Sequence, residues 1–276
     1  IAQHARAQKP SVIYSRDKTV LLALRLLSNA PLAWEVHGLE PSWAVRFLKH
    51  ATFVAITEGV KEMLVSRGIP GERVCVAHDG VDLTPFAHQE SKDGARHRLG
   101  LPLDKKIAMY IGRLDGWKGV GTLLDASVLL PRDVQVVIIG GEQAQVEALR
   151  AAYPGVMFLG FLPYRDIASN EAAADVLVLP NTARDITSLK YTSPLKLFAY
   201  MASGVPMVAS DLPSTREIVS ENEAFFFEPD NAGALARSIA EALSAADAPV
   251  RAGRARQKVA EYTWDKRAER IQTFIL

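Results

Sequence analysis

The sequence predicts an α/β protein with two doubly wound parallel sheets. Short apolar segments typical of buried strands alternate with helical segments along nearly the whole chain, and this alternation produces right-handed crossovers and parallel sheets. A polar, poorly periodic stretch at 87–104 divides the pattern into two runs. The length of 276 residues is sufficient for two modest domains, each with its own core.

The first predicted domain comprises residues 1–86. Residues 1–9 have the pattern of the end of a helix. Predicted strands follow at 11–15, 31–37, 52–56 and 73–77, with helices at 19–28, 43–50 and 58–67. Thr57 is a suitable N-cap for the third of these helices, and Gly68 is a suitable residue to end it.

After an interdomain linker at 87–104, the second predicted domain comprises residues 105–248. Its predicted strands lie at 106–111, 134–139, 156–159, 175–179, 206–210 and 224–228. Helices are predicted between them at 121–130, 143–153, 165–173, 193–204 and 214–219, and after the last strand at 232–245. The tail, 249–276, has two helical segments that are broken near 262–265.

The composition argues against several classes of protein. A net charge of +1 is unlike a nucleic-acid-binding protein, which normally carries a basic stripe. Cys75 is the single cysteine, so a disulfide framework within the chain is excluded and a core thiol is expected. Arg25 interrupts the best apolar run, and no segment reaches the length of a membrane span. We expect a cytoplasmic location, with peripheral membrane contact left open.

The helix predicted at 193–204 is the first candidate binding element. Ser193 is a suitable N-cap, Pro194 suits the first helical position, and Gly204 is a suitable end. The free backbone N–H groups and the positive dipole at such a helix start attract anions. The alternative is a helix start without a ligand, as at most such positions in α/β proteins.

A glycine-rich turn after the predicted strand 106–111 is the second candidate. It carries Arg113 and Lys118, two cations held where a strand leads into a helix, and Gly112 allows a ligand to approach the backbone. The carboxyl ends of parallel strands are where α/β sheets bind ligands, so this pair suits a diphosphate. The alternative is a pair of solvated surface cations.

Together these motifs resemble the retaining glycosyltransferases of family 4. Gly-Arg-Leu-x-x-x-Lys-Gly at 112–119 is similar to that family's donor-diphosphate motif, and Ser-Pro-Leu-Lys-Leu-Phe-x-Tyr-Met-Ala-x-Gly-x-Pro at 193–206 is similar to its donor-binding helix. The resemblance implies the GT-B fold, with two Rossmann-like domains that face each other across a cleft. It also implies retaining sugar transfer from a UDP- or GDP-linked donor to a sugar, a lipid-linked or a small-molecule acceptor, in glycan or glycolipid synthesis and without a metal or other cofactor.

The resemblance also implies roles for particular residues. Arg113, Lys118 and His37 would be the catalytic residues, with His37 on the donor sugar unless it is an ordinary structural histidine. Phe161 and Leu162 would lie against the nucleobase unless their loop is simply buried. The remaining donor-binding residues are Gly112, Thr192, Ser193, Pro194, Leu195 and position 199. In the polar loop 182–190, the residues that suit the sugar hydroxyls are Asp185, Thr187 and Ser188.

The chain departs from the family pattern at Ala199, where relatives usually have a glutamate that binds the ribose. Relatives also have strand–helix units before the point where this sequence starts, so we expect the first domain to be N-terminally incomplete, and self-association through it stays open. The last helix of the tail would return to the first domain, as in relatives. Two other functions stay open: a catalytically impaired nucleotide-sugar-binding fragment, and a GT-B nucleotide-sugar epimerase.

Overall fold

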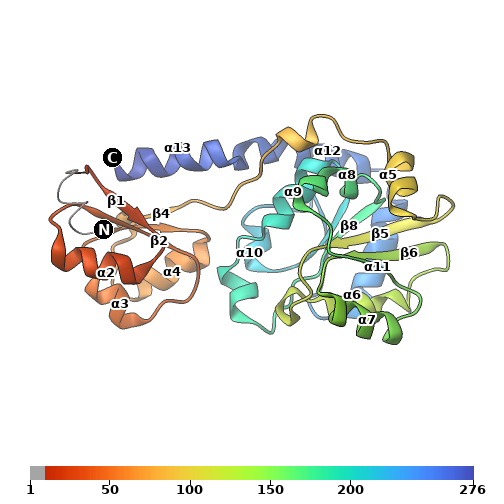
Figure 1. Cartoon of the computed structure of the whole chain (residues 1–276), viewed down its shortest axis with the longest axis horizontal. Helices are drawn as coiled ribbons and strands as arrows, with labels where there is room; N and C mark the ends of the chain where they lie inside the picture. Colours follow the sequence, from red (N-terminus) through yellow and green to blue (C-terminus); the bar gives the residue numbers. More distant parts are fainter. Residues whose placement is uncertain (1–9) are drawn as a thin grey trace.

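The computed structural model describes residues 10–276 and contains two parallel sheets (Figure 1). The helix end expected at 1–9 lies outside the described residues. The first sheet has the order β1-β2-β3-β4, with strands Ile13–Ser15, Leu32–Val36, Thr52–Ala55 and Val74–Val76. The helices that connect them are α2 (Lys18–Leu27), α3 (Ser42–Phe47) and α4 (Glu58–Ser66).

Large apolar side chains fill the core of the first sheet. The rings of Trp34 and Phe53 lie 5.8 Å apart on neighbouring strands and are fully buried. Burying such aromatic side chains is among the largest contributions to the stability of a small sheet. The predicted cap of α4 is confirmed, because Thr57 Oγ1 accepts a hydrogen bond from the Val60 N–H at 3.1 Å.

The second sheet has six parallel strands in the order β10-β9-β8-β5-β6-β7. They are β5 (Lys106–Ile111), β6 (Val134–Ile139), β7 (Met157–Gly160), β8 (Val176–Leu179), β9 (Met207–Ser210) and β10 (Phe225–Phe227). The chain first adds strands on one side of β5 and then on the other. The strand order therefore reverses between β5 and β8, and a crevice forms outside the carboxyl ends of strands at such a switch point.

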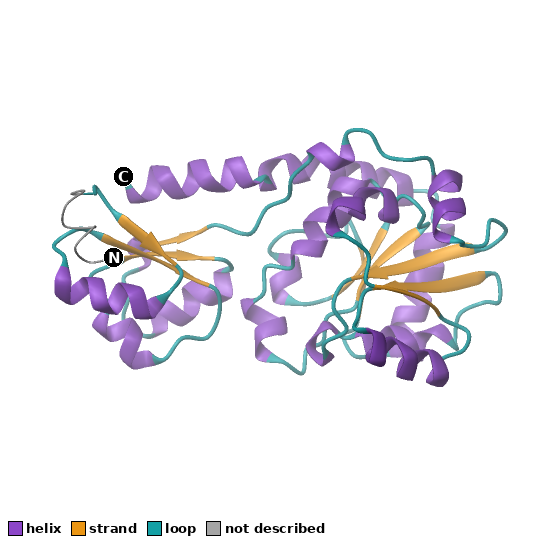
Figure 2. Cartoon of the chain, viewed as in Figure 1, coloured by secondary structure: helices purple, strands orange, loops and turns teal. Residues whose placement is uncertain are grey.

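Helices cover both faces of the second sheet (Figure 2). They are α6 (Val120–Ser127), α7 (Gln143–Ala152), α8 (Ile167–Glu171), α9 (Leu195–Ser203), α10 (Pro213–Arg216), α11 (Ala232–Ser244) and α12 (Ala248–Lys258). The predicted alternation of strands and helices is confirmed. The helices expected at 165–173 and 214–219 are shorter, because a 3₁₀ turn at Tyr164–Asp166 precedes α8 and α10 ends at Arg216.

The N-cap predicted for the 193–204 helix is wrong. Pro194 occupies the cap position of α9, and no side chain of the described chain caps it. The Ser193 hydroxyl instead accepts a hydrogen bond from the Asp79 N–H at 2.9 Å, which joins the two halves of the molecule. The predicted end is confirmed, because Gly204 has a φ of 71°, in the left-handed region that favours glycine.

The segment 87–104 packs on the second sheet. It contains α5 (Lys92–Leu99), whose Arg96 donates to Asp175 Oδ2 at 2.6 Å just before β8. Ala95 and Leu101 are buried in the core of the second sheet. This stretch therefore forms part of the helical layer, and its Arg96 side chain is buried against the second sheet.

The tail returns to the first sheet, where α13 (Trp264–Ile275) lies along its strands (Figure 1). Ile271 packs in one cluster with Val54 and Ala77. The chain crosses between the two sheets twice, side by side, and the Val81 N–H donates to the Tyr262 carbonyl at 2.9 Å. Within residues 10–276, no helix combines the length and apolar character needed to cross a bilayer.

Candidate functional site

A cavity of about 620 Å³ lies between the two sheets, at the switch point between β5 and β8. Its wall includes all the residues predicted as catalytic or donor-binding: His37, Gly112, Arg113, Lys118, Phe161, Leu162, Thr192, Ser193, Pro194, Leu195 and Ala199. These residues come from four separate stretches of the chain: 37, 112–118, 161–162 and 192–199. A volume of this size suits a ligand as large as a nucleotide.

Gly112 allows a lysine to reach the floor of the cavity. Its φ of 147° lies in the range that favours glycine, and a Cβ atom there would stand 2.9 Å from Lys196 Nζ. A side chain at this position would therefore be strained and would press on the ammonium group. The glycine therefore leaves space at the end of β5 for both a ligand and the Lys196 side chain.

Lys118 points into the cavity from the turn after β5. The pKa of its ammonium is lowered to about 8, chiefly by burial; Asp115 acts in the opposite direction, and the charge of Arg113 contributes to the lowering. The nitrogen lies 3.4 Å from the centre of the Trp117 ring, a cation–π contact. A bound anion would stabilise this charge and raise the pKa again.

Arg113 lies at the mouth of the cavity. Its side chain is 82% exposed, and Nε lies 3.0 Å from Asp115 Oδ2. Exposed ion pairs of this kind contribute little to stability, so the guanidinium can exchange its partner for a ligand phosphate at small cost. The structure brings Arg113 and Lys118 to one cavity, as predicted, but it also supplies an internal competitor in Asp115.

Lys196 is a third cation of the cavity, which the sequence reasoning missed as a binding residue. Its Nζ donates to the Tyr110 hydroxyl at 2.6 Å and lies 3.9 Å from the centre of that ring. Within the described chain no carboxylate lies within ion-pair distance of it. Burial, and then the charge of Lys118, hold the pKa of this lysine well below its usual range. A cation inside the apolar segment 195–202 was the available signal.

The N-terminus of α9 faces the same cavity. Pro194 and Leu195 line the wall, and the first N–H groups of this nine-residue helix receive no side-chain cap from the described residues. Uncapped N–H groups at a helix start bind anions. Because Ser193 does not cap α9, the N–H groups of this helix end are available to a ligand.

His37 enters the cavity from the first sheet as part of a charged network. Its Nε2 is hydrogen-bonded to Glu35 Oε1, and Glu35 also pairs with Arg267 Nη2 of α13 at 3.0 Å. Burial raises the pKa of Glu35, but the contacts with His37 and Arg267 outweigh it and keep that pKa below its ordinary value. Burial raises the pKa of nearby Asp79, which also lines the cavity. The network fixes the orientation of the imidazole, and sequence reasoning had not connected its members.

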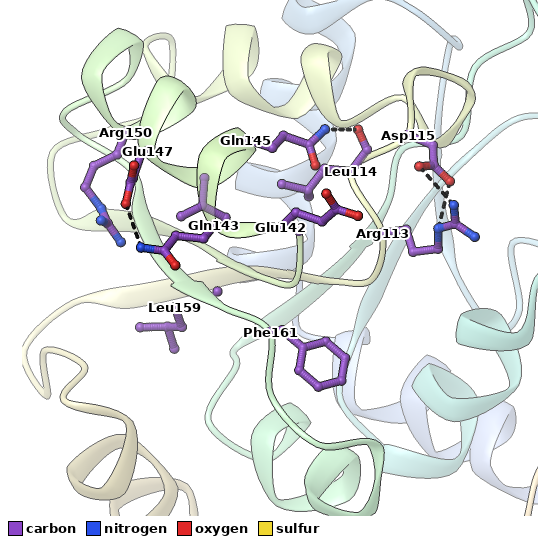
Figure 3. A pocket seen from close by; sticks show the side chains of 13 residues that line it. Arg113, Leu114, Asp115, Glu142, Gln143, Gln145, Glu147, Arg150, Leu159 and Phe161 are labelled. Atoms are coloured by element: carbon purple, nitrogen blue, oxygen red, sulfur yellow. Dashed lines mark hydrogen bonds and ion pairs between the residues drawn. The ribbon is translucent and has the colours of Figure 1, made fainter.

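A second cavity of about 1000 Å³ continues from the first along α7 (Figure 3). The two share Arg113, Gly141 and Phe161. The Phe161 side chain is 79% exposed between them, where an aromatic ring is available for stacking on a planar ligand. Gln145 donates from Nε2 to the Leu114 carbonyl at 3.0 Å and so ties α7 to the turn that carries Arg113.

The polar loop before α9 is only partly directed at the cavity. Thr187 lines it, whereas Asp185 Oδ1 accepts from the N–H groups of Thr187 and Ser188 at 2.8 and 3.2 Å. These bonds start a π-helical turn over Thr187–Tyr191, a form that is frequent at functional sites. Among the three residues considered for the sugar hydroxyls, Thr187 is therefore the one placed on the cavity wall.

Comparison with curated proteins finds glycosyltransferases. TuaC of Bacillus subtilis, a glycosyltransferase named for teichuronic acid biosynthesis, is 29% identical over 161 residues, or 58% of this chain. The D-inositol 3-phosphate glycosyltransferase of Streptomyces scabiei is 28% identical over 218 residues, or 71% of this chain. The chain spans 39% of the length of the first relative and 47% of the second.

Solved structures share the fold over nearly the whole chain. HepE of Anabaena, in complex with UDP-glucose, superposes with a TM-score of 0.79 at 20% identity, covering 99% of this chain and 79% of its own. The sucrose-phosphate synthase of Thermosynechococcus elongatus gives a TM-score of 0.80 at 21% identity, with 98% and 74% covered. The family model described as glycosyl transferases group 1 matches residues 105–245. Because that match covers more than half of the chain, the protein belongs to the glycosyl transferases group 1 family, and its two parallel sheets are those of the GT-B fold.

Proposed function

We propose that this chain is a retaining glycosyltransferase of family 4 that uses a nucleoside-diphosphate sugar as its donor. The observation that carries the proposal is the convergence of three cations and one uncapped helix start on one cavity. Arg113, Lys118 and Lys196 all line it, together with the N-terminus of α9. A diphosphate is the ligand that matches this set of charges and N–H donors.

The same groups would act on the reaction itself. When the bond between the anomeric carbon and the diphosphate oxygen breaks, negative charge develops on the departing phosphate. Lys118 and Lys196, fixed in a partly enclosed site, would stabilise that charge, and such prepared electrostatic stabilisation is often the largest catalytic contribution. The acceptor oxygen would bond to the same face of the sugar, and its proton would pass to the leaving phosphate.

His37 and Phe161 would position the two ends of the donor. The imidazole, held by Glu35, lies on the first-sheet side of the cavity and would contact the sugar. The exposed Phe161 ring would lie against the nucleobase. The donor would be UDP- or GDP-linked. The structure of HepE of Anabaena in complex with UDP-glucose supports a nucleoside-diphosphate sugar as the class of donor.

In this proposal the cations meet the diphosphate charge and no metal is required. The prediction is that a chelator leaves donor affinity unchanged. Three cations in one cavity are sufficient to balance a diphosphate, which supports the proposal.

The test is calorimetric titration of UDP and GDP into wild type and the double variant Arg113→Ala/Lys118→Ala. We expect loss of at least tenfold in affinity, since each charge-assisted hydrogen bond contributes about 1.5–3 kcal/mol. The matched control is Lys106→Ala/Arg132→Ala, which removes two cations at the opposite end of β5 and β6. Equal affinity of wild type and the double variant would contradict the diphosphate assignment.

Turnover distinguishes the remaining functions. A retaining transferase gives a product with the donor's anomeric configuration, visible by NMR, when an acceptor is present. Isomerised donor without acceptor would instead indicate an epimerase. Ala199, which lacks the ribose-binding carboxylate of the family pattern, favours a second candidate: a nucleotide-sugar-binding protein without turnover, which would bind the donor and leave it intact.

A further inference from the structure

Glu171, the last residue of α8, is a carboxylic acid with no visible partner. The residue is fully buried at 0% exposure, and neither carboxyl oxygen has a hydrogen-bond partner among the described residues. Burial raises the pKa of this group well above its usual range. Burial therefore favours the neutral acid in the empty protein, whose O–H donor and acceptor oxygens are unused.

Packing alone does not explain this residue. An unpartnered polar group in the interior destabilises the fold, and an apolar side chain of similar size would be more favourable there. The neighbours Ile167 and Ala168 belong to the apolar core that α8 and α9 share. A buried carboxyl with no partner in the empty protein is accounted for if a ligand supplies the partner.

The position of Glu171 indicates where that ligand lies. Ile167, Asn170 and Glu171 share one face of α8, because they are spaced by three and four residues. Ile167 and Asn170 line the cavity between the sheets. Tyr164 on the cavity wall and Tyr200 on α9 both lie near Glu171: burial raises the pKa of each tyrosine, and a negative charge on Glu171 would add to that effect.

Ala199 leaves the wall thin at this point. Ala199 lines the cavity next to Tyr200, with 1% exposure, and its side chain is a single methyl group, whereas Leu195 and Lys196 line the same cavity from the first turn of α9. Because α8 packs against α9, the carboxyl of Glu171 lies in the layer next to the wall to which Ala199 contributes. A larger residue at 199 would separate that carboxyl from a ligand.

We propose that Glu171 is the ribose-binding residue of this cavity, and that its carboxyl hydrogen-bonds the ribose hydroxyls of the donor nucleotide beside Ala199. The inference rests on the proposed function, since it takes a nucleoside diphosphate as the ligand. It moves the carboxyl that the family pattern puts on α9 to the neighbouring helix α8. In this arrangement the small side chain of Ala199 leaves room for the ligand, and Glu171 supplies the carboxyl.

The test compares ribose selectivity in wild type and Glu171→Leu. UDP and GDP and their 2′,3′-dideoxy analogues are titrated by calorimetry. Wild type should bind the better ribonucleotide about ten- to hundredfold more tightly than its dideoxy analogue, the effect of one or two hydrogen bonds to a carboxylate. Glu171→Leu should bind both with the dideoxy affinity, and it should melt at a higher temperature because the unpartnered acid is gone.

Two further variants make the result specific. Glu241→Leu, an exposed glutamate of α11, is the matched control and should keep full selectivity. Glu171→Leu/Ala199→Glu returns a carboxyl to the same wall from α9 and should restore selectivity. Ala199→Glu alone brings two carboxyls together and should not tighten binding.

The outcomes separate this inference from the proposed function. If wild type discriminates and Glu171→Leu discriminates equally, Glu171 is not the ribose partner, while the diphosphate site stands. If wild type binds the dideoxy analogue as tightly as the ribonucleotide, the ribose contact is refuted, again with the diphosphate site intact. If wild type binds neither UDP nor GDP, both the inference and the proposed function are wrong.

Discussion

Replacement of Lys196 by methionine tests the cavity's most enclosed cation. Methionine keeps the unbranched shape of lysine and its helix propensity but removes the charge. Two consequences of opposite sign follow from the structure. The empty protein loses a poorly solvated ammonium, and the ligand complex loses a charged donor.

The magnitudes come from the contacts of this residue. Lys196→Met removes one hydrogen bond, Nζ to the Tyr110 hydroxyl at 2.6 Å, which costs about 1 kcal/mol. An ion held in the interior without a counter-ion costs several kcal/mol. The net change favours the variant, and each 1 kcal/mol raises the melting temperature by about 2–4 °C in a protein of this size.

Binding should change in the other direction. A charge-assisted hydrogen bond to a phosphate contributes about 1.5–3 kcal/mol, so Lys196→Met should bind UDP or GDP about ten- to hundredfold more weakly. Calorimetry gives the affinity, and thermal unfolding without ligand gives the stability. If Lys196→Met melts at a higher temperature and binds the nucleotide less tightly, Lys196 contributes to ligand binding at the expense of stability.

The matched control is Lys106→Met. Lys106 is the exposed first residue of the strand β5 that also carries Tyr110, at the end away from the cavity. It should change neither quantity. The reasoning about Lys196 is refuted if Lys196→Met binds the nucleotide as tightly as wild type, or if it melts well below wild type while the control does not.

Three more predictions concern the same cavity. Because free Lys118 has a pKa of about 8 and a bound diphosphate raises it, binding should take up protons and weaken about tenfold per pH unit above pH 8. Lys118→Arg should reduce this dependence to the part that comes from Lys196, whose pKa burial also lowers. Calorimetry in buffers of different ionisation enthalpy measures the proton uptake. Gly112→Ala places a Cβ 2.9 Å from Lys196 Nζ at a φ of 147°, so it should weaken nucleotide binding at least about tenfold. Because the loss would come from displacement of Lys196, the double variant Gly112→Ala/Lys196→Met should bind little more weakly than Lys196→Met. Additive losses would contradict this explanation. Glu35→Gln frees His37 and removes the nearer of the two carboxylates beside Arg267, which keeps Asp79 at 4.0 Å. The melting temperature should therefore fall, and affinity for the sugar-linked donor should fall more than affinity for the free diphosphate. An equal loss for both ligands would argue against a sugar contact by His37.

The order of the elements and the location of the cavity follow from sequence patterns. Apolar runs of strand length alternate with helical segments, and both sheets have the predicted parallel strands. Gly112, Lys118 and the 193–206 motif all reach one cavity, because each lies at the carboxyl end of a strand or at the start of a helix in a doubly wound sheet. Periodicity and local spacing are properties of short segments, so the sequence is sufficient to place them.

The partners of individual side chains depended on contacts between distant segments. Ser193 has the composition of an N-cap, yet its hydroxyl bonds the Asp79 N–H, 114 residues away. Glu35 meets Arg267 only because α13 returns across the first sheet. The apolar neighbours of Lys196 in the sequence indicate burial but not its partner, and only packing of α9 against β5 and of α8 against α9 shows Lys196 and Glu171 as buried ionisable groups.

The physical reason is that the sequence carries local preferences, whereas burial and pairing are set by the packing of elements. Helix propensity, capping and apolar spacing act over a few residues and can be recognised one segment at a time. The solvation of a charge depends on every neighbour within several ångströms, whatever its place in the chain. The chain by itself therefore determined the two parallel sheets and the motifs that bring cations to one crevice. Only the tertiary structure decided that, within residues 10–276, one of those cations lacks a counter-ion and the buried carboxyl of α8 lacks a hydrogen-bond partner.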